Sequence, residues 1–473
     1  MPERITADVI VIGSGAGGAA VAGELASAGR RVLMLEAGPW PPGWPKGHAR
    51  NADPSEAGLA AYGRLLEGHL VFPSKAAAAI PGLAGYKVAH LFGGMFALWT
   101  CNCPDPDPLE LPPWDDPANW RGYLGKARTL LHVSQDIGRE GARMQRLLAA
   151  AKRAVGALPP ERDVQPMPVA ACEKDGKLFF SSAEDLLRGD TLPAESLDII
   201  TDVVVRRILH EGGKARGVVF SPTGGGPEIE AAADIIVVAA GTIGSAKLLA
   251  ASSLDCGPAF GSGIYDHPAF ASRVRLRREI IDDVPADDPI FTVWVPFSEA
   301  HPWHNQLCLF PGLPAPLSIA AEPLEAADIF TWVPMDIDPD NRLQFDSTRL
   351  DPFGLPEVSV DAFRLSDATR RRAGLALAEH FRIASEIGEL GDGWYPAFYK
   401  PGESTHLMGS CRMGARDDGT SVVDAHGRLW HYQNIYVVGN AVLAQSNAGN
   451  PTLTTIAAAL RTADEILGRH QQL

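Results

Sequence analysis

The sequence lacks several features that would place it in a common class. Its 473 residues contain no apolar run of about eighteen residues or more, which excludes a membrane-spanning helix. The first residues, Met1–Arg4, lead directly into an apolar segment at 7–12, so we expect no secretory signal peptide. Cysteine is scarce and scattered without the paired spacing of zinc sites, at positions 101, 103, 172, 256, 308 and 411. These absences predict reduced thiols, no metal site and a cytoplasmic location.

Positive charge is also in short supply. Lysine and arginine number 42 against 57 aspartates and glutamates, which gives a formal net charge of −15. A nucleic-acid-binding surface needs clustered basic residues, and a highly anionic substrate would be repelled, so both are disfavoured. The apolar fraction of 46% is ordinary for a globular protein, and the length exceeds what one hydrophobic core usually organises. We therefore expect two domains, no nucleic-acid partner and no membrane partner.

A glycine loop near the N-terminus is the first positive signal. The run Val9–Ile12 predicts a strand, and an alanine-rich helix is expected from the loop to about Ala28. Glu36 closes the next strand, where a carboxylate accepts hydrogen bonds from ribose hydroxyls and repels the 2′-phosphate of NADP. A G-x-G-x-x-G loop in this context binds a pyrophosphate at the helix N-terminus, and alone it does not separate NAD from FAD. The loop residues are Gly13, Ser14, Gly15, Ala16 and Gly18.

Segments of nucleotide-binding character lie at both ends and in the middle of the chain. We predict paired strands at 199–205 and 215–220, a strand at 234–239 with a helix at 243–252, a strand at 435–438 and a closing helix at 456–467. Alternating strands and Pro-rich loops fill 266–345, and a long helix follows at 366–388. This interleaving predicts a nucleotide domain made of 1–105, 166–265 and 406–473. The substrate-binding domain is then 266–405, with 106–165 as a connecting segment on the substrate side.

The C-terminal part carries a pattern that resembles a known family. The segment His406–Gly414 reads H-L-M-G-S-C-R-M-G, and it is followed by Gly439–Asn440 and by Asn447–Thr454. This pattern resembles the glucose–methanol–choline (GMC) oxidoreductases, and specifically their pyranose oxidase-like branch. The segments Gly93–Cys101 and His301–Gln306 also resemble stretches of that branch, and the likeness extends over residues 8–467. It implies a mixed α/β fold, with a Rossmann-type FAD-binding domain and an interleaved substrate domain built on an antiparallel sheet backed by helices.

The resemblance also implies the chemistry. It makes FAD the cofactor, His406 the general base and Asn450 its polar partner. Removing hydride from a carbinol carbon requires that the hydroxyl proton leave, and an imidazole can take that proton near neutral pH. The alternative for His406 is a buried structural histidine without a chemical role. Asn450, which precedes Pro451, is also expected to be the N-cap of a helix, a role that is compatible with catalysis. The cofactor-binding residues implied are Gly13, Ser14, Gly15, Ala16, Gly18, Glu36, Gly93, Gly94, Thr100, Val203, Gly439, Asn440, Pro451 and Thr452.

Two positions depart from the family pattern. Leu98 replaces the histidine that bonds covalently to the flavin in many pyranose oxidases, which predicts FAD held without a covalent bond. Gln306 matches a substrate-side glutamine, but Phe310 stands where the branch has an aspartate. An apolar ring suits stacking on an aglycone or a less polar substrate, and it argues against free glucose.

Three further histidines are weaker candidates. His267 is expected to be structural because most buried polar side chains are satisfied by protein partners. His301 and His304 are candidates for lining the substrate cavity.

The sequence therefore predicts an FAD-dependent enzyme that oxidises a secondary alcohol of a sugar, glycoside or sugar-like natural product to a ketone. Electrons would pass to oxygen or to another acceptor. A non-sugar primary alcohol as substrate, an NAD-dependent dehydrogenase and a flavin-binding protein without catalysis stay open as alternatives. The motifs do not distinguish one oligomeric state from another.

Overall fold

The computed structural model describes residues 5–40, 47–51, 70–71, 80–188, 195–285, 288–289, 292–309, 325–391 and 395–468. Phe310, one of the two predicted substrate residues, lies outside these ranges. Within them, no helix combines the length and the apolar character that crossing a bilayer requires.

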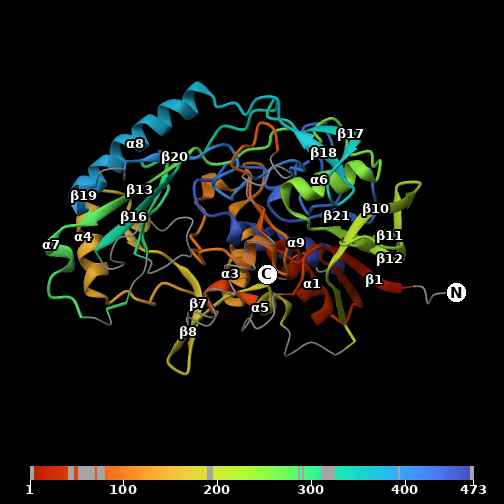
Figure 1. Cartoon of the computed structure of the whole chain (residues 1–473), viewed down its shortest axis with the longest axis horizontal. Coiled ribbons are helices and arrows are strands. Elements are labelled where there is room, and N and C mark those ends of the chain that lie inside the picture. The colour runs from red at the N-terminus through yellow and green to blue at the C-terminus, as the bar shows by residue number, and fades with distance from the viewer. Residues whose placement is uncertain are drawn as a thin grey trace.

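The first sheet joins strands from the beginning, the middle and the end of the chain (Figure 1). Its strands are β1 (Ile5–Ile12), β2 (Val32–Leu35), β9 (Leu197–Ile200), β10 (Val203–Glu211), β11 (Lys214–Pro222), β12 (Ile229–Val238) and β21 (Ile435–Val437). They lie in the order β10-β11-β12-β1-β2-β9, and β21 also pairs with β12. The β21, β12, β1, β2 and β9 strands run parallel, whereas β10 and β11 are antiparallel.

Helices cover the parallel part of this sheet, which explains its apolar strands. The β1 residues Val9–Ile12 are all buried, as expected for a parallel strand with both faces covered. The α1 helix (Ala16–Ser27) packs on β1, β2 and α9 (Thr452–Leu467), and α3 (Pro117–Leu130) packs on α9. The α6 helix (Gly241–Ala251) lies against β10. The small residues of α1 let it approach β1 and α9 closely, because ten consecutive residues from 17 to 26 are buried.

One predicted strand is divided in two. Residues 199–205 were expected to form a single strand paired with 215–220, but Asp202 adopts a positive φ of 58° and interrupts it. The residues before Asp202 belong to β9, which pairs in parallel with β2, and only those after it belong to β10, which pairs with β11. The polar residues Thr201 and Asp202 separate the two apolar runs, but polar residues also occur within strands, so periodicity alone does not establish a break.

The second sheet is antiparallel and lies beside the first (Figure 1). Its strands are β6 (Gln165–Pro166), β13 (Ala269–Leu276), β14 (Thr292–Val295), β15 (His304–Cys308), β16 (Ala326–Trp332), β19 (Gly388–Leu390) and β20 (Ala397–Phe398). Their order is β19-β13-β16-β15-β14-β6, and β20 pairs with β13. The α4 (Ala142–Val155) and α8 (Asp367–Ile387) helices back this sheet, and α8 forms its outer layer in Figure 1.

Alternation along the strands gives the second sheet two different faces. One face packs on α4 and α8 through an apolar layer that includes Leu147, Val293, Leu307, Ile329 and Ile383. The other face carries His304, Gln306 and Trp332. On this face Gln306 contacts Asn450 and Trp332 contacts His406, both from the C-terminal part of the chain. The predicted mixed α/β fold, with an antiparallel sheet backed by helices, is confirmed.

Smaller elements complete the described part of the chain. They are β3 (Leu70–Val71) with β4 (Val88–Ala89), β5 (Val133–Ser134) with β7 (Val169–Lys174) and β8 (Lys177–Phe180), β17 (Gln344–Leu350) with β18 (Pro356–Ser359), α5 (Ala183–Leu187) and α7 (Arg278–Ile281).

Candidate active site

The glycine loop has the close packing that requires glycine at two of its positions. Gly13 has a φ of 102°, and a Cβ there would lie 2.6 Å from the carbonyl oxygen of Ala239. A Cβ on Gly18 would lie 2.1 Å from the carbonyl oxygen of Gly13. Gly15 differs, because its Cβ would meet only the carbonyl oxygen of Gly93, at 3.9 Å. The space in front of Gly15 and the N-terminus of α1 is therefore open, as a pyrophosphate site requires.

Glu36 ties the glycine loop to the other predicted cofactor residues. Its carboxylate accepts hydrogen bonds from the Ser14 hydroxyl at 2.6 Å and from the backbone N–H groups of Ser14 and Gly38 at 3.0 and 2.9 Å. The Ser14 hydroxyl oxygen in turn accepts from the Gly93 N–H at 2.8 Å, and the Val203 N–H donates to the Glu36 carbonyl oxygen. Burial raises the pKa of Glu36, against the lowering effect of these hydrogen bonds. A carboxylate has about four lone-pair positions, so Glu36 keeps capacity for a ribose hydroxyl.

The remaining predicted cofactor residues lie around the same loop. Gly94 packs on Gly15, and a Cβ on Gly17 would lie 2.9 Å from the backbone nitrogen of Gly439. The Asn440 side-chain oxygen accepts a hydrogen bond from the Thr455 hydroxyl, at 2.6 Å, which fixes Asn440 against α9.

Thr100 and Leu98 lie in the segment that follows Gly93 and Gly94. The Thr100 hydroxyl oxygen accepts a long 3.4 Å hydrogen bond from the Asn102 N–H, a local contact between side chain and backbone. Leu98 packs on the small apolar cluster of Ala89, Leu91 and Ala97.

His406, Asn450 and Gln306 converge from distant parts of the chain. The Nε2 atom of His406 lies 3.3 Å from the side-chain nitrogen of Asn450. The side-chain amides of Asn450 and Gln306 are hydrogen-bonded at 2.6 Å, and the Asn102 side chain donates to Gln306 at 2.7 Å. The structure thus brings together the two predicted catalytic residues and the predicted substrate residue that it describes.

The prediction that Asn450 caps a helix is wrong. The α9 helix begins at Thr452, its N-cap position is Pro451, and no side chain forms a cap hydrogen bond there. The Asn450 side chain is turned instead toward Gln306 and His406. The first N–H groups of α9 consequently have no side-chain cap, and a helix N-terminus of this kind favours an electron-rich group.

A buried carboxylate holds the backbone of His406 in place. The His406 N–H donates to the Ser404 hydroxyl oxygen at 3.0 Å, and the Ser404 hydroxyl donates to Asp266. Asp266 also accepts from the Gly402 N–H at 2.8 Å, and burial raises its pKa to about 6. Thr405 has a positive φ of 64°, so the turn that presents His406 is strained and needs this support. Sequence reasoning missed Asp266 as a support because no short motif links it to position 404.

Burial makes His406 a neutral imidazole near neutral pH. The pKa of His406 is lowered to about 4 because its surroundings do not solvate an imidazolium. His267 and His304 have pKa values well below the ordinary one, first through burial and then through the charge that His406 would carry. The His267 ring meets the His406 ring edge-on, with centroids 5.1 Å apart.

Several polar atoms beside His406 have no protein partner. Among the described residues, buried side-chain atoms without a hydrogen bond include His406 Nδ1, Trp332 Nε1 and both ring nitrogens of His267, so the expectation that protein partners satisfy His267 is wrong. The Trp332 ring lies 6.0 Å from the His406 ring, centroid to centroid. Buried polar groups are nearly always satisfied, so such a group of atoms around one imidazole fits a site that binds a polar ligand and a cofactor.

The histidines predicted to line the cavity have different positions. His304 belongs to this site, because its Nε2 lies 2.8 Å from the Gln306 amide and its Nδ1 accepts from the Trp294 N–H at 3.0 Å. His301 does not, because its ring is turned to Glu379 on α8, behind the sheet. The prediction that His301 lines the substrate cavity is therefore wrong. The turn at Ser298–His301, before β15, directs the ring to the opposite face of the sheet. A small cavity beside the site is lined by Pro104, Asp105, Trp294, Phe297, His304 and Asn450.

Glu110 anchors the loop that carries Asn450. This buried side chain accepts hydrogen bonds from the backbone N–H groups of Ala448, at 2.6 Å, and Asp107, at 2.8 Å. Burial raises the pKa of Glu110, against these hydrogen bonds. Sequence reasoning missed it, since an isolated Glu in a Pro-rich segment carries no signal. Across the described ranges, no three His, Cys, Asp or Glu side chains converge as a metal ligand set would.

Family comparisons agree over most of the chain. Two models described as GMC oxidoreductase match residues 112–269 and 338–459, which together make up more than half of the sequence. A model described as FAD binding domain matches residues 8–64, the segment that contains the glycine loop and Glu36.

Individual relatives match nearly end to end. A C-glycoside 3-oxidase of Arthrobacter globiformis is 29% identical, over 97% of this chain and 94% of the relative. A pyranose 2-oxidase of Lyophyllum shimeji is 23% identical, over 97% of this chain and 91% of the relative. The crystal structure of pyridoxine 4-oxidase from Mesorbium loti superposes with a TM-score of 0.68 at 19% identity, over 98% of this chain and all of that one. At that identity the structural match shows a shared fold alone.

Proposed function

The chain belongs to the GMC oxidoreductase family, and from that premise we propose that it oxidises a secondary alcohol of a sugar, glycoside or sugar-like natural product to a ketone. The observation that carries the proposal is the convergence of His406, Asn450 and Gln306 beside polar atoms without protein partners. Relatives named C-glycoside 3-oxidase and pyranose 2-oxidase cover nearly the whole chain and support a sugar-like donor.

FAD supplies the hydride acceptor when it is bound, and the chain supplies its site. We propose that the open space at Gly15 and the N-terminus of α1 hold the pyrophosphate, that Glu36 binds the ribose, and that the uncapped N-terminus of α9 at Thr452 faces the flavin. The FAD-binding part would be assembled from 1–105, 166–265 and 406–473, since strands of all three segments share the first sheet. Leu98 offers no nucleophile, so denaturation should release the flavin intact.

His406 performs the proton step. Its neutral imidazole accepts the hydroxyl proton of the substrate at Nε2, the nitrogen beside Asn450, as the C–H bond breaks. Burial favours this role because a neutral base is present without any need for alkaline conditions. The Asp266–Ser404 hydrogen bonds hold the backbone that carries the imidazole in place during the transfer.

Asn450 and Gln306 orient the alcohol. Asn450 reaches the same region as His406 Nε2, so its amide can hydrogen-bond the substrate oxygen without competing for the proton. Gln306 fixes the Asn450 amide from the second sheet. His304 fixes Gln306 and is itself held by the Trp294 N–H. Electrons then leave to oxygen or another acceptor. The six unpaired cysteines support a reducing, cytoplasmic location.

The pKa of His406 gives a direct pH prediction. A base with a pKa of about 4 is almost wholly neutral at about pH 5.5, so flavin reduction there should match that at about pH 8 within about twofold. The rate should fall only as the pH approaches about 4, where the imidazolium forms. An ordinary histidine with a pKa of about 6.5 would lose about tenfold at pH 5.5. Anaerobic stopped-flow reduction across this range separates the two, and a tenfold loss would contradict the buried base.

The substrate class is tested by anaerobic mixing of the FAD-loaded protein with candidate donors. Bleaching of the visible flavin band by glycosides or pyranoses, with a ketone as product, is the expected result. Bleaching by simple primary alcohols alone would favour the non-sugar alternative. A protein that is colourless after purification and is stabilised by NAD would support a nicotinamide enzyme instead. Parallel assays with oxygen and a dye acceptor identify the electron acceptor.

A further inference from the structure

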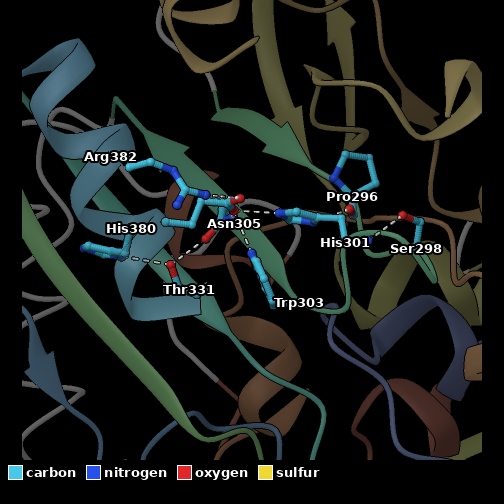
Figure 2. Close-up of polar contacts among 9 residues, drawn as sticks. Pro296, Ser298, His301, Trp303, Asn305, Thr331, His380 and Arg382 are labelled. Carbon is cyan, nitrogen blue, oxygen red and sulfur yellow. Dashed lines mark hydrogen bonds and ion pairs between the residues drawn. The ribbon is translucent and has the colours of Figure 1, made fainter. Parts of the chain in front are cut away.

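Behind the second sheet, on the side away from His406, a carboxylate lies in a largely apolar layer. Glu379 of α8 is only 3% exposed. One of its oxygens, Oε1, accepts hydrogen bonds from the side chains of His301 at 2.6 Å, Trp303 at 2.6 Å and Asn305 at 3.0 Å (Figure 2). The other oxygen faces the Arg382 guanidinium at 3.4 Å. Four donors around one carboxylate require it to be ionised.

His301 is the matching cation. Its Nδ1 lies 3.0 Å from the carbonyl oxygen of Pro296, and its Nε2 lies 2.6 Å from Glu379 Oε1. Both neighbours are acceptors, so both ring nitrogens carry a hydrogen and the ring is an imidazolium. Burial raises the pKa of Glu379, but the hydrogen bonds and the charge of His301 outweigh burial and lower it overall. The Glu379–His301 pair is thus a buried ion pair, and Arg382 adds a second, largely exposed cation at its edge.

A second set of hydrogen bonds extends the pair across the sheet. The Asn305 side-chain oxygen accepts from the Thr331 hydroxyl of β16 at 2.5 Å, and Thr331 meets His380 Nδ1 of α8 at 2.8 Å (Figure 2). The other His380 nitrogen lies 2.6 Å from the Ser272 hydroxyl of β13. Asn305 is therefore held on both sides of its amide, by α8 and by the neighbouring strand.

The position of Asn305 in β15 connects this cluster to the active site. Successive side chains of a strand point to opposite faces, so His304 and Gln306 project to the face opposite Asn305. On that face Gln306 is hydrogen-bonded to Asn450, which lies beside His406. The hydrogen bonds that hold Asn305 against α8 therefore also hold the β15 backbone. They thereby set the distance between the Gln306 and Asn450 side chains.

Stability alone does not explain an ion pair at this place. Apolar residues of similar volume are often as stabilising as a buried ion pair, whereas hydrogen bonds to an ionised group have a defined direction. We propose that the Glu379–His301 ion pair is a positioning device, which acts through Asn305 and Gln306 on Asn450. This inference rests on the proposed function, and Glu379, His301 and Asn305 are positioning residues that do not touch the substrate.

The Asn305→Leu variant tests the proposal, because it removes the link while keeping the branched shape of the side chain. The matched control is Leu307→Ala, which removes packing from the same face of β15 and leaves the polar cluster intact. We expect Asn305→Leu to slow flavin reduction by glycoside about tenfold, since small misplacements of orienting groups have effects of this order or larger. Leu307→Ala should lower the melting temperature but keep the rate within about twofold. Thr331→Val, a milder break, should slow reduction about threefold if Asn305→Leu does not fold.

A double-variant cycle shows whether Asn305 acts through Gln306. If it does, the double variant should reduce its flavin less than about twofold more slowly than Gln306→Leu alone. The reason is that Gln306→Leu has already removed the contact with Asn450 through which Asn305 would act. Multiplied effects, or a normal rate in Asn305→Leu, would overturn the proposal. Hydrogen exchange of residues 304–308, measured relative to the global stability of each variant, provides a readout without catalysis and should accelerate in Asn305→Leu more than in Leu307→Ala. Equal exchange in the two variants also overturns it, even if no glycoside reduces the wild-type flavin and the proposed function itself fails.

Discussion

The His406→Ala variant is expected to reduce its flavin at least about a hundredfold more slowly than the wild-type protein. A positioned general base accelerates a reaction by about a hundredfold to ten-thousandfold. Alanine removes the imidazole beside Asn450 that accepts the hydroxyl proton. FAD content should be unchanged, because the His406 side chain takes no part in the contacts of the glycine loop. The measurement is the limiting rate of flavin reduction under anaerobic conditions at saturating donor.

The control for this variant is His431→Ala. His431 lies near the surface and pairs with Asp255 and Asp417, and its removal should leave the rate unchanged within about twofold. A His406→Ala protein that reduces at the wild-type rate would remove His406 from the mechanism. The flavin-binding alternative without catalysis would then be favoured.

The Gly15→Val variant is expected to lose FAD while the apoprotein still folds. A Cβ at Gly15 would meet only the Gly93 carbonyl oxygen, at 3.9 Å, and the Gly15 backbone, with φ −63° and ψ −179°, is open to any residue. The valine side chain would therefore occupy the space proposed for the pyrophosphate without disturbing the loop. FAD affinity should fall at least about a hundredfold, because the bulk displaces both phosphates from the helix N-terminus.

Two further glycine substitutions complete this test. Gly125→Val lies on α3 with nothing within 4 Å of its Cβ, so it should bind FAD normally and keep its stability, because valine has a slightly higher helix propensity than glycine. Gly18→Val should fail to fold, because its Cβ would lie 2.1 Å from the Gly13 carbonyl oxygen. A yellow Gly15→Val protein with wild-type FAD affinity would contradict the proposed cofactor site.

Local sequence patterns predicted the parts of the fold in which short-range chemistry decides the structure. The strand, glycine turn and helix over residues 9–27 follow from apolar runs and from glycine positions that no other residue fits. The long helix at 366–388 follows from its periodicity and matches α8, with Ser366 as the N-cap. The break at Asp202 coincides with the polar residues Thr201 and Asp202, but polar residues also occur within strands, so the positive φ was not predictable from periodicity.

The site was predictable only in part, and the reason is sequence distance. His406 and Asn450 lie in a motif-bearing segment, and the resemblance to a family identified them. Their supports come from elsewhere: Asp266 lies 138 residues from Ser404, and Glu379 lies 78 residues from His301. Tertiary packing alone creates such contacts, so no spacing rule reveals them. The direction of His301 was wrong for the same reason, since a turn decides which face of the sheet the ring meets.

The most direct test of this account is the crystal structure of the FAD-loaded protein with a bound glycoside. The account predicts that His406 Nε2 and the Asn450 amide lie on one face of the flavin ring, beside N5. Both should then be within about 2.6–3.2 Å of the hydroxyl oxygen that is oxidised. A structure in which either side chain lies on the other face, or remote from the ring, would contradict the central claim.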